Sequence, residues 1–313
     1  MKYKRIFTII ICAYNAENRI YKAIESVLQQ EEYDELIHEF LIIDNNSIDN
    51  TANVIKKYLS KKDNIKYIFQ SKQGLSFARL AGVEQTNSEW IIFIDDDNIL
   101  QSNWLLEAYN YIKNNKNVGA FNGAVVPLIE YELNAEQKKV LEIIYPGLAC
   151  THLKIEDIDP KQIIHPHKMP FGAGLIILAG PLHKLALNGW IKVTGRKGEE
   201  LSSGEDTEMC MYVKSSGYKF GYNSNMLILH IIHVNRLSKK YALRLFEGFA
   251  NYLAFKVREM TFFHKSIYLF KNLSIYVLKM ILLSIKKDPI KKEIQHKYYE
   301  TFFRKVYIFK KYI

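Results

Sequence analysis

Apolar runs and amphipathic segments alternate along the first 125 residues of the chain. Uninterrupted apolar runs such as RIFTIIICAY are typical of strands that are buried on both faces of a parallel sheet. The segments between them repeat apolar residues at helical spacing. We expect strands at 5–14, 38–46, 64–70, 89–97 and 118–127. We expect helices at 20–28, 49–60, 75–86 and 103–115. This repetition predicts an α/β fold with a mostly parallel, doubly wound sheet flanked by helices.

The pattern is less regular between residues 126 and 238. An irregular stretch at 128–170 is followed by a segment with several glycines. We expect further strands at 169–180 and 225–233, and helices at 183–190 and 207–217. We therefore divide residues 1–238 into two halves of one domain, 1–125 and 126–238.

Residues 239–313 are expected to form a separate helical extension. An amphipathic helix is predicted at 239–260. The apolar segment 266–287 is nearly long enough to cross a bilayer, but Lys271, Asn272 and Lys279 interrupt it, and each is costly at the membrane centre. A helix that lies in the membrane interface is therefore favoured over one that spans the membrane.

The positive charge of the chain is concentrated in this extension. The net charge is +10, yet residues 1–235 carry 25 basic and 28 acidic residues, and residues 236–313 carry 18 basic and 5 acidic ones. Basic amphipathic helices bind anionic membrane surfaces, which makes such a surface the expected partner. Simple solvation of packed helices is the alternative. Because the charge is spread along apolar helices, we expect no nucleic-acid partner.

Composition and cysteine spacing indicate in which cellular compartment the chain is expected. The chain is 48% hydrophobic, which is sufficient for a sizeable core. Cys12, Cys150 and Cys210 are too widely spaced for a zinc ribbon, and they fit a reducing compartment. The apolar N-terminal run ends at Tyr14 and Asn15 without a cleavage site, so it reads as a strand rather than a signal peptide. We expect a cytoplasmic protein that is peripheral on the inner face of the cell membrane.

Acidic side chains follow the predicted strands at one edge of the sheet. Asp95, Asp96 and Asp97 come directly after the run WIIFI, and Asp44 follows the second strand. The carboxyl ends of parallel strands form the ligand-binding edge of such sheets. Because side chains alternate along an extended segment, Asp95 and Asp97 are expected to share one side. Paired carboxylates suit a hard divalent cation that bridges phosphates.

Six motifs in order resemble those of family 2 glycosyltransferases of the GT-A fold. They are TIIICAYNAEN, LIIDNNSIDNT, QGLSFARLAG, FIDDDN, FGAGLII and SSGEDTEM, and the resemblance covers roughly residues 5–240. It implies a Rossmann-like GT-A domain at 1–238, with 1–125 as the nucleotide-sugar binding half and 126–238 as the acceptor and catalytic half. It also implies transfer of a sugar from a nucleotide diphosphate donor with inversion at the anomeric carbon.

The resemblance implies a donor site and a metal site. Asp44 would bind the base, and Asp97 would bind Mg²⁺ or Mn²⁺ on the diphosphate. His230 would also touch the metal, although a lone histidine at a strand end is as often structural. The remaining donor-binding residues would be Tyr14, Glu17, Gly74, Arg79, Asp95 and Asp96. Asn45 stands where the family often has a second acid, which leaves one fewer charge near the base.

The motif GED at 204–206 is the second acidic centre. Inversion by single displacement needs a general base for the acceptor hydroxyl, and the resemblance assigns that role to Asp206 in the catalytic pair with Glu205. A plain acidic helix N-terminus is the structural alternative. Gly172, Gly174 and Trp190 are candidates for the acceptor site. The structural alternatives are a bulge for the two glycines and a place in the core for Trp190.

The sequence thus predicts a metal-dependent inverting glycosyltransferase. The donor would be a nucleotide diphosphate sugar, with a UDP-sugar as the family's commonest choice, and the acceptor a hydroxyl of a glycan or a lipid-linked glycan. Two other functions stay open: a nucleotidyltransferase, and a non-catalytic protein that binds nucleotide sugars at the membrane. A nucleotidyltransferase would need a basic, Gly-rich loop early in the chain, and CAYNAEN is not one.

Overall fold

The computed structural model of the chain describes residues 4–161, 169–190, 195–196, 201, 204–285 and 288–307. It divides into two units. The first consists of Met1–Glu130, Leu148–Gly198 and Gly204–Ile232, and the second of Tyr131–Gly147, Glu199–Ser203 and His233–Ile313. The sequence had suggested a division after residue 238, and it did not indicate that residues 131–147 group with the C-terminal helices.

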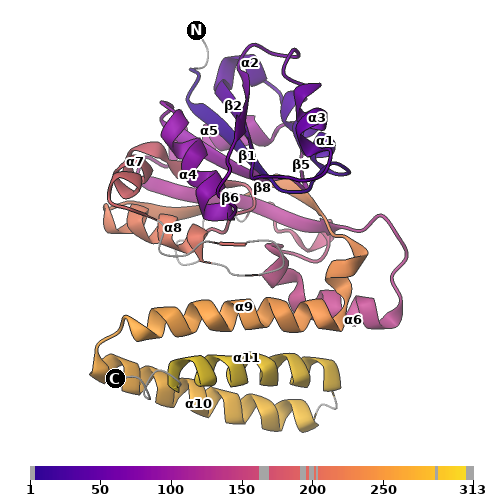
Figure 1. The fold of residues 1–313 in the computed structure, drawn as a ribbon, viewed down its shortest axis with the longest axis vertical. Coiled ribbons are helices and arrows are strands. Elements are labelled where there is room, and N and C mark those ends of the chain that lie inside the picture. The colour runs from indigo at the N-terminus through magenta and orange to yellow at the C-terminus, as the bar shows by residue number, and fades with distance from the viewer. Residues whose placement is uncertain are drawn as a thin grey trace. The chain divides into compact units, whose positions relative to one another are not determined.

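Four parallel strands form the first half of the sheet in unit 1 (Figure 1). They are β1 (Phe7–Ala13), β2 (Ile37–Asp44), β3 (Ile65–Phe69) and β4 (Trp90–Asp95), in the order β3-β2-β1-β4. Helices α1 (Ile20–Leu28), α2 (Tyr33–Leu36), α3 (Thr51–Lys56) and α4 (Leu75–Gln85) connect them. The strands β1 and β4 are buried almost throughout because both of their faces are covered. This half confirms the predicted parallel α/β arrangement.

The second half of the sheet is mixed. It contains β5 (Asn98–Leu100), β6 (Val118–Leu128), β7 (Leu175–Leu178) and β8 (Lys219–Ile231), and it extends the order as β4-β7-β6-β8-β5. β7 runs antiparallel to both β4 and β6, whereas β6 and β8 are parallel. β5 pairs antiparallel with β8. The repeated pattern of the N-terminal half gave no sign of these reversals, and β5 is too short to be recognised from periodicity.

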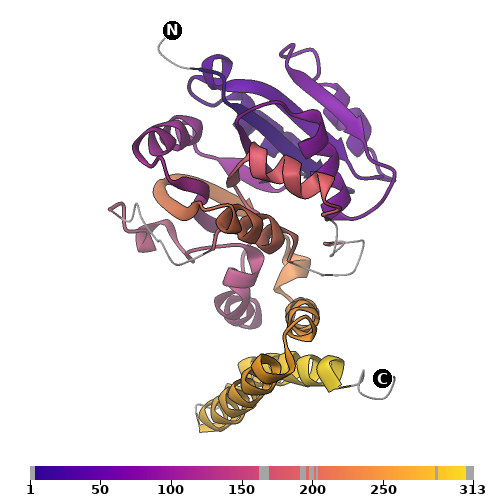
Figure 2. The same cartoon turned by 90° about the vertical axis from the view of Figure 1, so that its left-hand side faces the viewer.

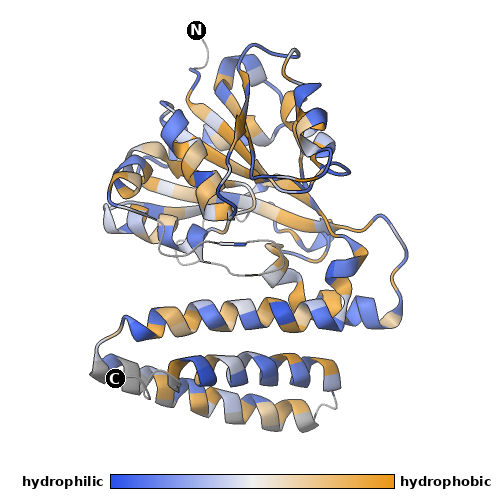
Figure 3. Cartoon of the chain, in the orientation of Figure 1, coloured by the Kyte–Doolittle hydropathy of each residue, from blue (hydrophilic) through white to orange (hydrophobic). Residues whose placement is uncertain are grey.

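One large part of the core of unit 1 lies between the sheet and three helices. α4, α7 (Ala179–Leu187) and α8 (Glu205–Ser215) cover one face, and α5 (Trp104–Asn114) contacts β8. Figure 3 shows the strands as mainly hydrophobic. The core side chains on this face include Ile10, Leu41, Ile43, Phe93, Leu175, Ile177, Leu182, Trp190 and Met209.

The second unit is helical. It contains α6 (Ala135–Ile144), α9 (Lys239–Arg258), α10 (Phe262–Ile285) and α11 (Pro289–Tyr307). Figure 2 shows α9, α10 and α11 in orange to yellow, packed together. α9 and α11 bury a shared apolar cluster that includes Ala250, Ala254, Val257, Phe302 and Val306. None of the described helices combines the length and the apolar character that crossing a membrane requires.

Two helices of this unit were not predicted. α6 lies within the stretch that seemed irregular, although it begins with a capping box: Asn134 Oδ1 accepts from the Gln137 N–H at 2.8 Å, and Gln137 Oε1 accepts from the Asn134 N–H at 3.0 Å. α11 lies in the predicted helical extension, 239–313, but in a part of it for which no individual helix was predicted. The predicted segment 266–287 corresponds to α10, except that residues 286–287 lie outside the described residues.

Candidate active site

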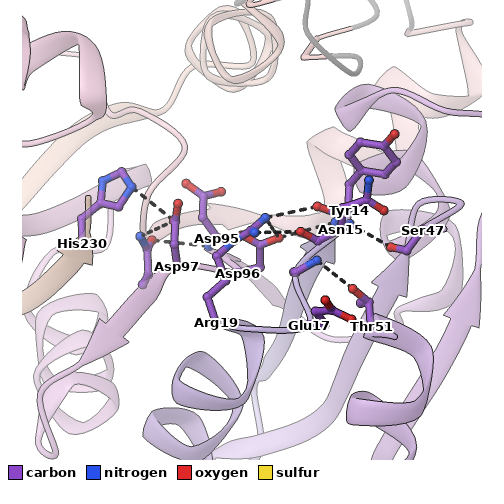
Figure 4. Close-up of polar contacts among 12 residues, drawn as sticks. Tyr14, Asn15, Glu17, Arg19, Ser47, Thr51, Asp95, Asp96, Asp97 and His230 are labelled. Atoms are coloured by element: carbon purple, nitrogen blue, oxygen red, sulfur yellow. Dashed lines mark hydrogen bonds and ion pairs between the residues drawn. The ribbon is translucent and has the colours of Figure 1, made fainter. Parts of the chain in front are cut away.

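The acidic run leaves the sheet at the carboxyl end of β4. β4 pairs with β1 on one side and β7 on the other, and this pairing fixes where Asp95 emerges. The side chain of Asp95 is 32% exposed, whereas Asp96 and Asp97 are buried. Figure 4 shows that the three carboxylates diverge, with Asp97 directed toward His230 and Asp96 toward Arg19. The three residues therefore have different neighbours and are not equivalent.

Asp97 and His230 meet because β5 follows the acidic run directly and pairs with β8. The register pairs Asn98 with His230, and the Ile231 N–H donates to the Asp97 carbonyl at 2.9 Å. Asp97 Oδ1 lies 3.2 Å from His230 Nε2. Burial alone would lower the pKa of His230, but the Asp97 carboxylate outweighs it and raises that pKa to about 10.

This pair can supply two ligands to a divalent cation. Among the described residues, no group of three or more His, Cys, Asp or Glu side chains is arranged around a common metal position. A magnesium-type ion at a phosphate site, however, takes only one or two protein ligands and completes its shell with substrate oxygens and water. A carboxylate oxygen and an imidazole nitrogen 3.2 Å apart fit such a partial site.

A buried arginine joins Asp95 to the second acidic centre. Arg79 of α4 is 2% exposed, and its Nη1 lies 3.3 Å from Glu205 Oε1. Its Nη2 lies 3.9 Å from Asp95 Oδ1, and its guanidinium stacks over the Phe93 ring. Burial raises the pKa of Glu205 although Arg79 opposes that shift. Arg79 is therefore a fixed cation between two acidic groups rather than a mobile surface charge.

Asp206 opens α8 beside this cation. Its Oδ2 accepts from the Gly172 N–H at 3.0 Å, and its Oδ1 accepts from the Thr207 N–H at 2.7 Å. A Cβ atom at Gly172 would lie 2.5 Å from Arg79 Nη2, so only glycine leaves room for the guanidinium there. Gly172 thus contacts both Asp206 and Arg79 through its backbone.

Asp44 lies at the end of β2 and is buried. Its Oδ1 accepts from the Ser47 N–H and its Oδ2 from the Tyr67 hydroxyl, each at 2.9 Å. Burial and the Asp44 hydrogen bond raise the pKa of Tyr67 to about 12. The next residue, Asn45, accepts from the Gly74 N–H at 2.7 Å and donates to the carbonyls of residues 70 and 72. Asn45 therefore shapes the loop before α4, where Gly74 has a φ of +138° that favours glycine.

The β1–α1 loop is bonded to the loop that follows Asp44. The Ala16 N–H donates to Thr51 Oγ1 at 2.7 Å. The Glu17 carboxylate accepts from the Asn50 N–H at 2.8 Å, at the start of α3. Glu17 therefore stabilises the α3 N-terminus. Tyr14 lies half-buried on the same loop, beside the acidic run.

Two of the predicted acceptor residues lie in the core. Trp190 is 3% exposed and packs with the hydrophobic cluster on the α4–α7–α8 face, so neither ring face is open to a sugar. This burial favours the core alternative for Trp190, and its acceptor role stays a prediction. A Cβ atom at Gly174, which has a φ of +66°, would lie 2.4 Å from Ile228 Cδ1. Gly174 is thus required by packing, while the acceptor role of Gly172 stays a prediction.

Three residues of the site were missed from the sequence. Arg19 pairs with Asp96, Tyr67 donates to Asp44, and Cys150 Sγ lies 3.9 Å from His230 Nδ1. Each lies far along the chain from its partner, so no spacing rule could have joined them. The sequence did show an arginine, Arg19, just before a helix that follows a predicted binding loop. Arginines at such positions are too common for this one to indicate a site residue.

Known proteins resemble the N-terminal part of the chain in sequence. Residues 8–160 match the family model described as Glycosyl transferase family 2. The poly(ribitol-phosphate) beta-N-acetylglucosaminyltransferase TarP of Staphylococcus aureus is 33% identical over 110 residues, which cover 34% of this chain and 33% of TarP. A cholesterol galactosyltransferase of Borreliella burgdorferi is 31% identical over 112 residues, 36% of this chain and 30% of that protein. These matches thus span about a third of each relative's length.

Structural similarity extends further than sequence similarity. The crystal structure of S. aureus TarS 1–349 in complex with UDP-GlcNAc superposes with a TM-score of 0.58 at 17% identity, over 96% of this chain and 81% of that chain. At this identity the likeness establishes the fold. The family match shows that residues 8–160 belong to glycosyl transferase family 2, and the structural likeness shows that the chain has the GT-A fold.

Proposed function

We propose that the chain is an inverting glycosyltransferase that moves a sugar from a UDP-sugar to a hydroxyl of a glycan or lipid-linked acceptor. The observation that carries the proposal is a chain of contacts within unit 1. His230 contacts Asp97, Asp95 lies two residues away and faces Arg79, and Arg79 pairs with Glu205, next to Asp206. These contacts support the proposal because they connect the residues proposed for the donor with the carboxylate proposed as the base, and a single displacement requires the two to be adjacent.

The nucleotide is proposed to bind along the β1, β2 and β4 ends. Asp44 would accept from the imide N–H of uracil with the lone pairs that Ser47 and Tyr67 leave, since a carboxylate has about four acceptor sites. Tyr14 would flank the base, and Asp95 would face the ribose. That TarS was solved with UDP-GlcNAc favours a uridine donor.

The diphosphate is proposed to lie at Asp97 and His230. A Mg²⁺ or Mn²⁺ ion bound there would neutralise the developing charge of the leaving diphosphate. His230 would have to bind as a neutral imidazole, so metal binding would release its proton to solvent. Arg79 would add a fixed positive charge on the sugar side of the site, where Glu205 holds it.

Asp206 is proposed as the general base. It would take the proton of the acceptor hydroxyl as the hydroxyl oxygen attacks the anomeric carbon and the bond to the nucleotide diphosphate breaks. The Gly172 N–H fixes the direction of its carboxylate, which lies in the first turn of α8. Glu205, which is buried against Arg79, would position that cation.

The direct test is turnover of nucleotide sugars by the purified chain. We expect UDP release from at least one of a panel of UDP-sugars in the presence of MnCl₂, with the release abolished by EDTA and restored by added Mn²⁺. The same panel with GDP- and dTDP-sugars serves as the comparison. Equal release with EDTA and with Mn²⁺, or no release and no thermal stabilisation by any nucleotide sugar, would end the proposal.

We also propose that α10 binds an anionic membrane surface. The helix sequence contains no Asp or Glu, and Leu278 and Leu282, one turn apart, are 58% and 46% exposed. The exposed Lys271 lies seven residues before Leu278, on the same helix face. Exposed leucines next to lysines are the composition of an interfacial helix.

We predict that Leu278→Glu combined with Leu282→Glu releases the full-length chain from vesicles of phosphatidylcholine with phosphatidylglycerol. The two substitutions remove apolar burial and add charges of the lipid's own sign, so apparent partitioning should fall at least about tenfold. Sedimentation with vesicles measures it. Leu187→Glu, at a leucine of α7 that is 87% exposed, is the matched control. Unchanged sedimentation of the double variant would contradict the proposal.

A further inference from the structure

Arg19 connects two parts of the proposed donor site. Its Nε and Nη2 donate to Asp96 Oδ1 and Oδ2 at 2.8 and 2.9 Å. Its Nη1 donates to the Asn15 carbonyl at 2.8 Å and its Nη2 to the Tyr14 carbonyl at 3.1 Å (Figure 4). The Tyr14 N–H points back to Asp96 Oδ2 at 3.4 Å. One guanidinium and one buried carboxylate thus join the β1–α1 loop to the acidic run.

The loop contains a residue with an uncommon backbone conformation. Asn15 has a φ of +47°, in the left-handed region, which few non-glycine residues adopt although asparagine is enriched there. The loop is also held from the other side, since the Asn15 N–H donates to Ser47 Oγ at 3.1 Å and Asn15 Oδ1 accepts from the Ile48 N–H at 3.0 Å. Arg19 supplies the contacts on the side of the acidic run.

The pairing gives the middle aspartate a different role from its neighbours. Asp95 and Asp97 face Arg79 and His230, whereas both carboxylate oxygens of Asp96 face Arg19. A bidentate pair fixes direction as well as distance. If Arg19 holds Asp96, it also fixes the turn from which Asp95 and Asp97 project.

We propose that Asp96 and Arg19 form a positioning pair that sets the β1–α1 loop and the acidic run at the spacing required for the nucleotide of the donor. The inference rests on the proposed function, since it concerns the same donor site. In this proposal Asp96 does not contact the donor. It affects donor binding indirectly, because it holds Arg19 in place. Arg19, which the sequence did not single out, becomes a determinant of donor affinity.

The test measures UDP binding by calorimetry in MnCl₂, at a temperature at which every variant is folded. Asp96→Asn and Arg19→Gln should each weaken UDP binding by about tenfold, because either change loosens the same connection. The double variant should bind no more weakly than the single ones, as expected for two residues that act through one contact. In turnover, the KM for the donor should rise more than kcat falls.

Two further variants separate positioning from general stability. Arg19→Lys keeps the charge but loses the planar fork, so it should also weaken UDP binding. Lys22→Gln is the matched control, since Lys22 lies on α1, the helix that Arg19 precedes, in an exposed pair with Glu130, at 2.5 Å. It should bind UDP as the wild type does. A thermal melting curve records any loss of stability separately.

The outcomes are distinct. Wild-type affinity in Asp96→Asn, Arg19→Gln and Arg19→Lys, or losses that add fully in the double variant, would overturn the positioning pair and leave the proposed function standing. A fall in melting temperature with unchanged UDP affinity would assign the pair to stability alone and overturn the inference as well. If the wild-type chain binds no nucleoside diphosphate, the proposed function fails, and the positioning pair fails with it.

Discussion

Replacing Asp206 with asparagine is expected to lower kcat by about 10³-fold while UDP binding stays at the wild-type level. A general base contributes about 10²–10⁴-fold, and an amide cannot take the proton of the acceptor hydroxyl. Asparagine still offers an oxygen to the Gly172 N–H, so the start of α8 should keep its geometry. Single-turnover transfer and calorimetry with UDP and Mn²⁺ measure the two quantities separately.

The control for this variant is Asp63→Asn, at an exposed aspartate of unit 1 that has no part in the proposed site. It should retain wild-type kcat. If Asp206→Asn kept more than about a tenth of the wild-type kcat, the proton would have to go elsewhere, and the base would have to be sought outside α8. If instead Asp206→Asn lost UDP binding, Asp206 would belong to the donor site.

Replacing Asp97 with asparagine should reduce activity by at least about 10²-fold and shift the Mn²⁺ concentration for half-maximal activity upward. The substitution keeps an oxygen near His230 and Asn98, so the local hydrogen bonds can persist. It removes the negative charge that a hard cation prefers in its ligands. A Mn²⁺ titration of UDP release measures both effects.

The comparison for Asp97 is Asp34→Asn, at an aspartate that is 64% exposed and paired with Lys62 at the surface. That variant should follow the wild-type Mn²⁺ curve. High activity of Asp97→Asn at the wild-type Mn²⁺ requirement would remove Asp97 from the metal site. The raised pKa of His230 would then report a structural ion pair between the two residues.

Periodicity predicted the half of the fold that repeats. The strands through β4 and the helices between them follow from apolar runs and helical spacing, because each unit must bury the same kind of face. β7 was expected as a strand, but its antiparallel direction depends on its partners β4 and β6, which the local pattern cannot encode. α6 shows the opposite case, in which a local capping box was present and overlooked.

In the candidate site, too, the sequence indicated the residues, whereas their contacts depend on the fold. Asp97 and His230, 133 residues apart, were both expected near the metal, and the β5–β8 pairing brings them to 3.2 Å. Arg79 and Glu205 were both expected in the site, but not as a buried ion pair. Trp190 was named as an acceptor candidate with the core as the alternative, since an aromatic residue after a helix looks the same in sequence in both places, and its burial favours the core. The burial of the side chain distinguishes the two places, and that burial depends on the whole fold.

The most direct test of the account is a structure of the chain with UDP and Mn²⁺. We predict that Asp97 and His230 hold the metal ion at the diphosphate, that uracil lies at Asp44, and that Arg79 lies on the sugar side of the diphosphate. A nucleotide seated elsewhere, or a metal ion that neither Asp97 nor His230 binds, would contradict it.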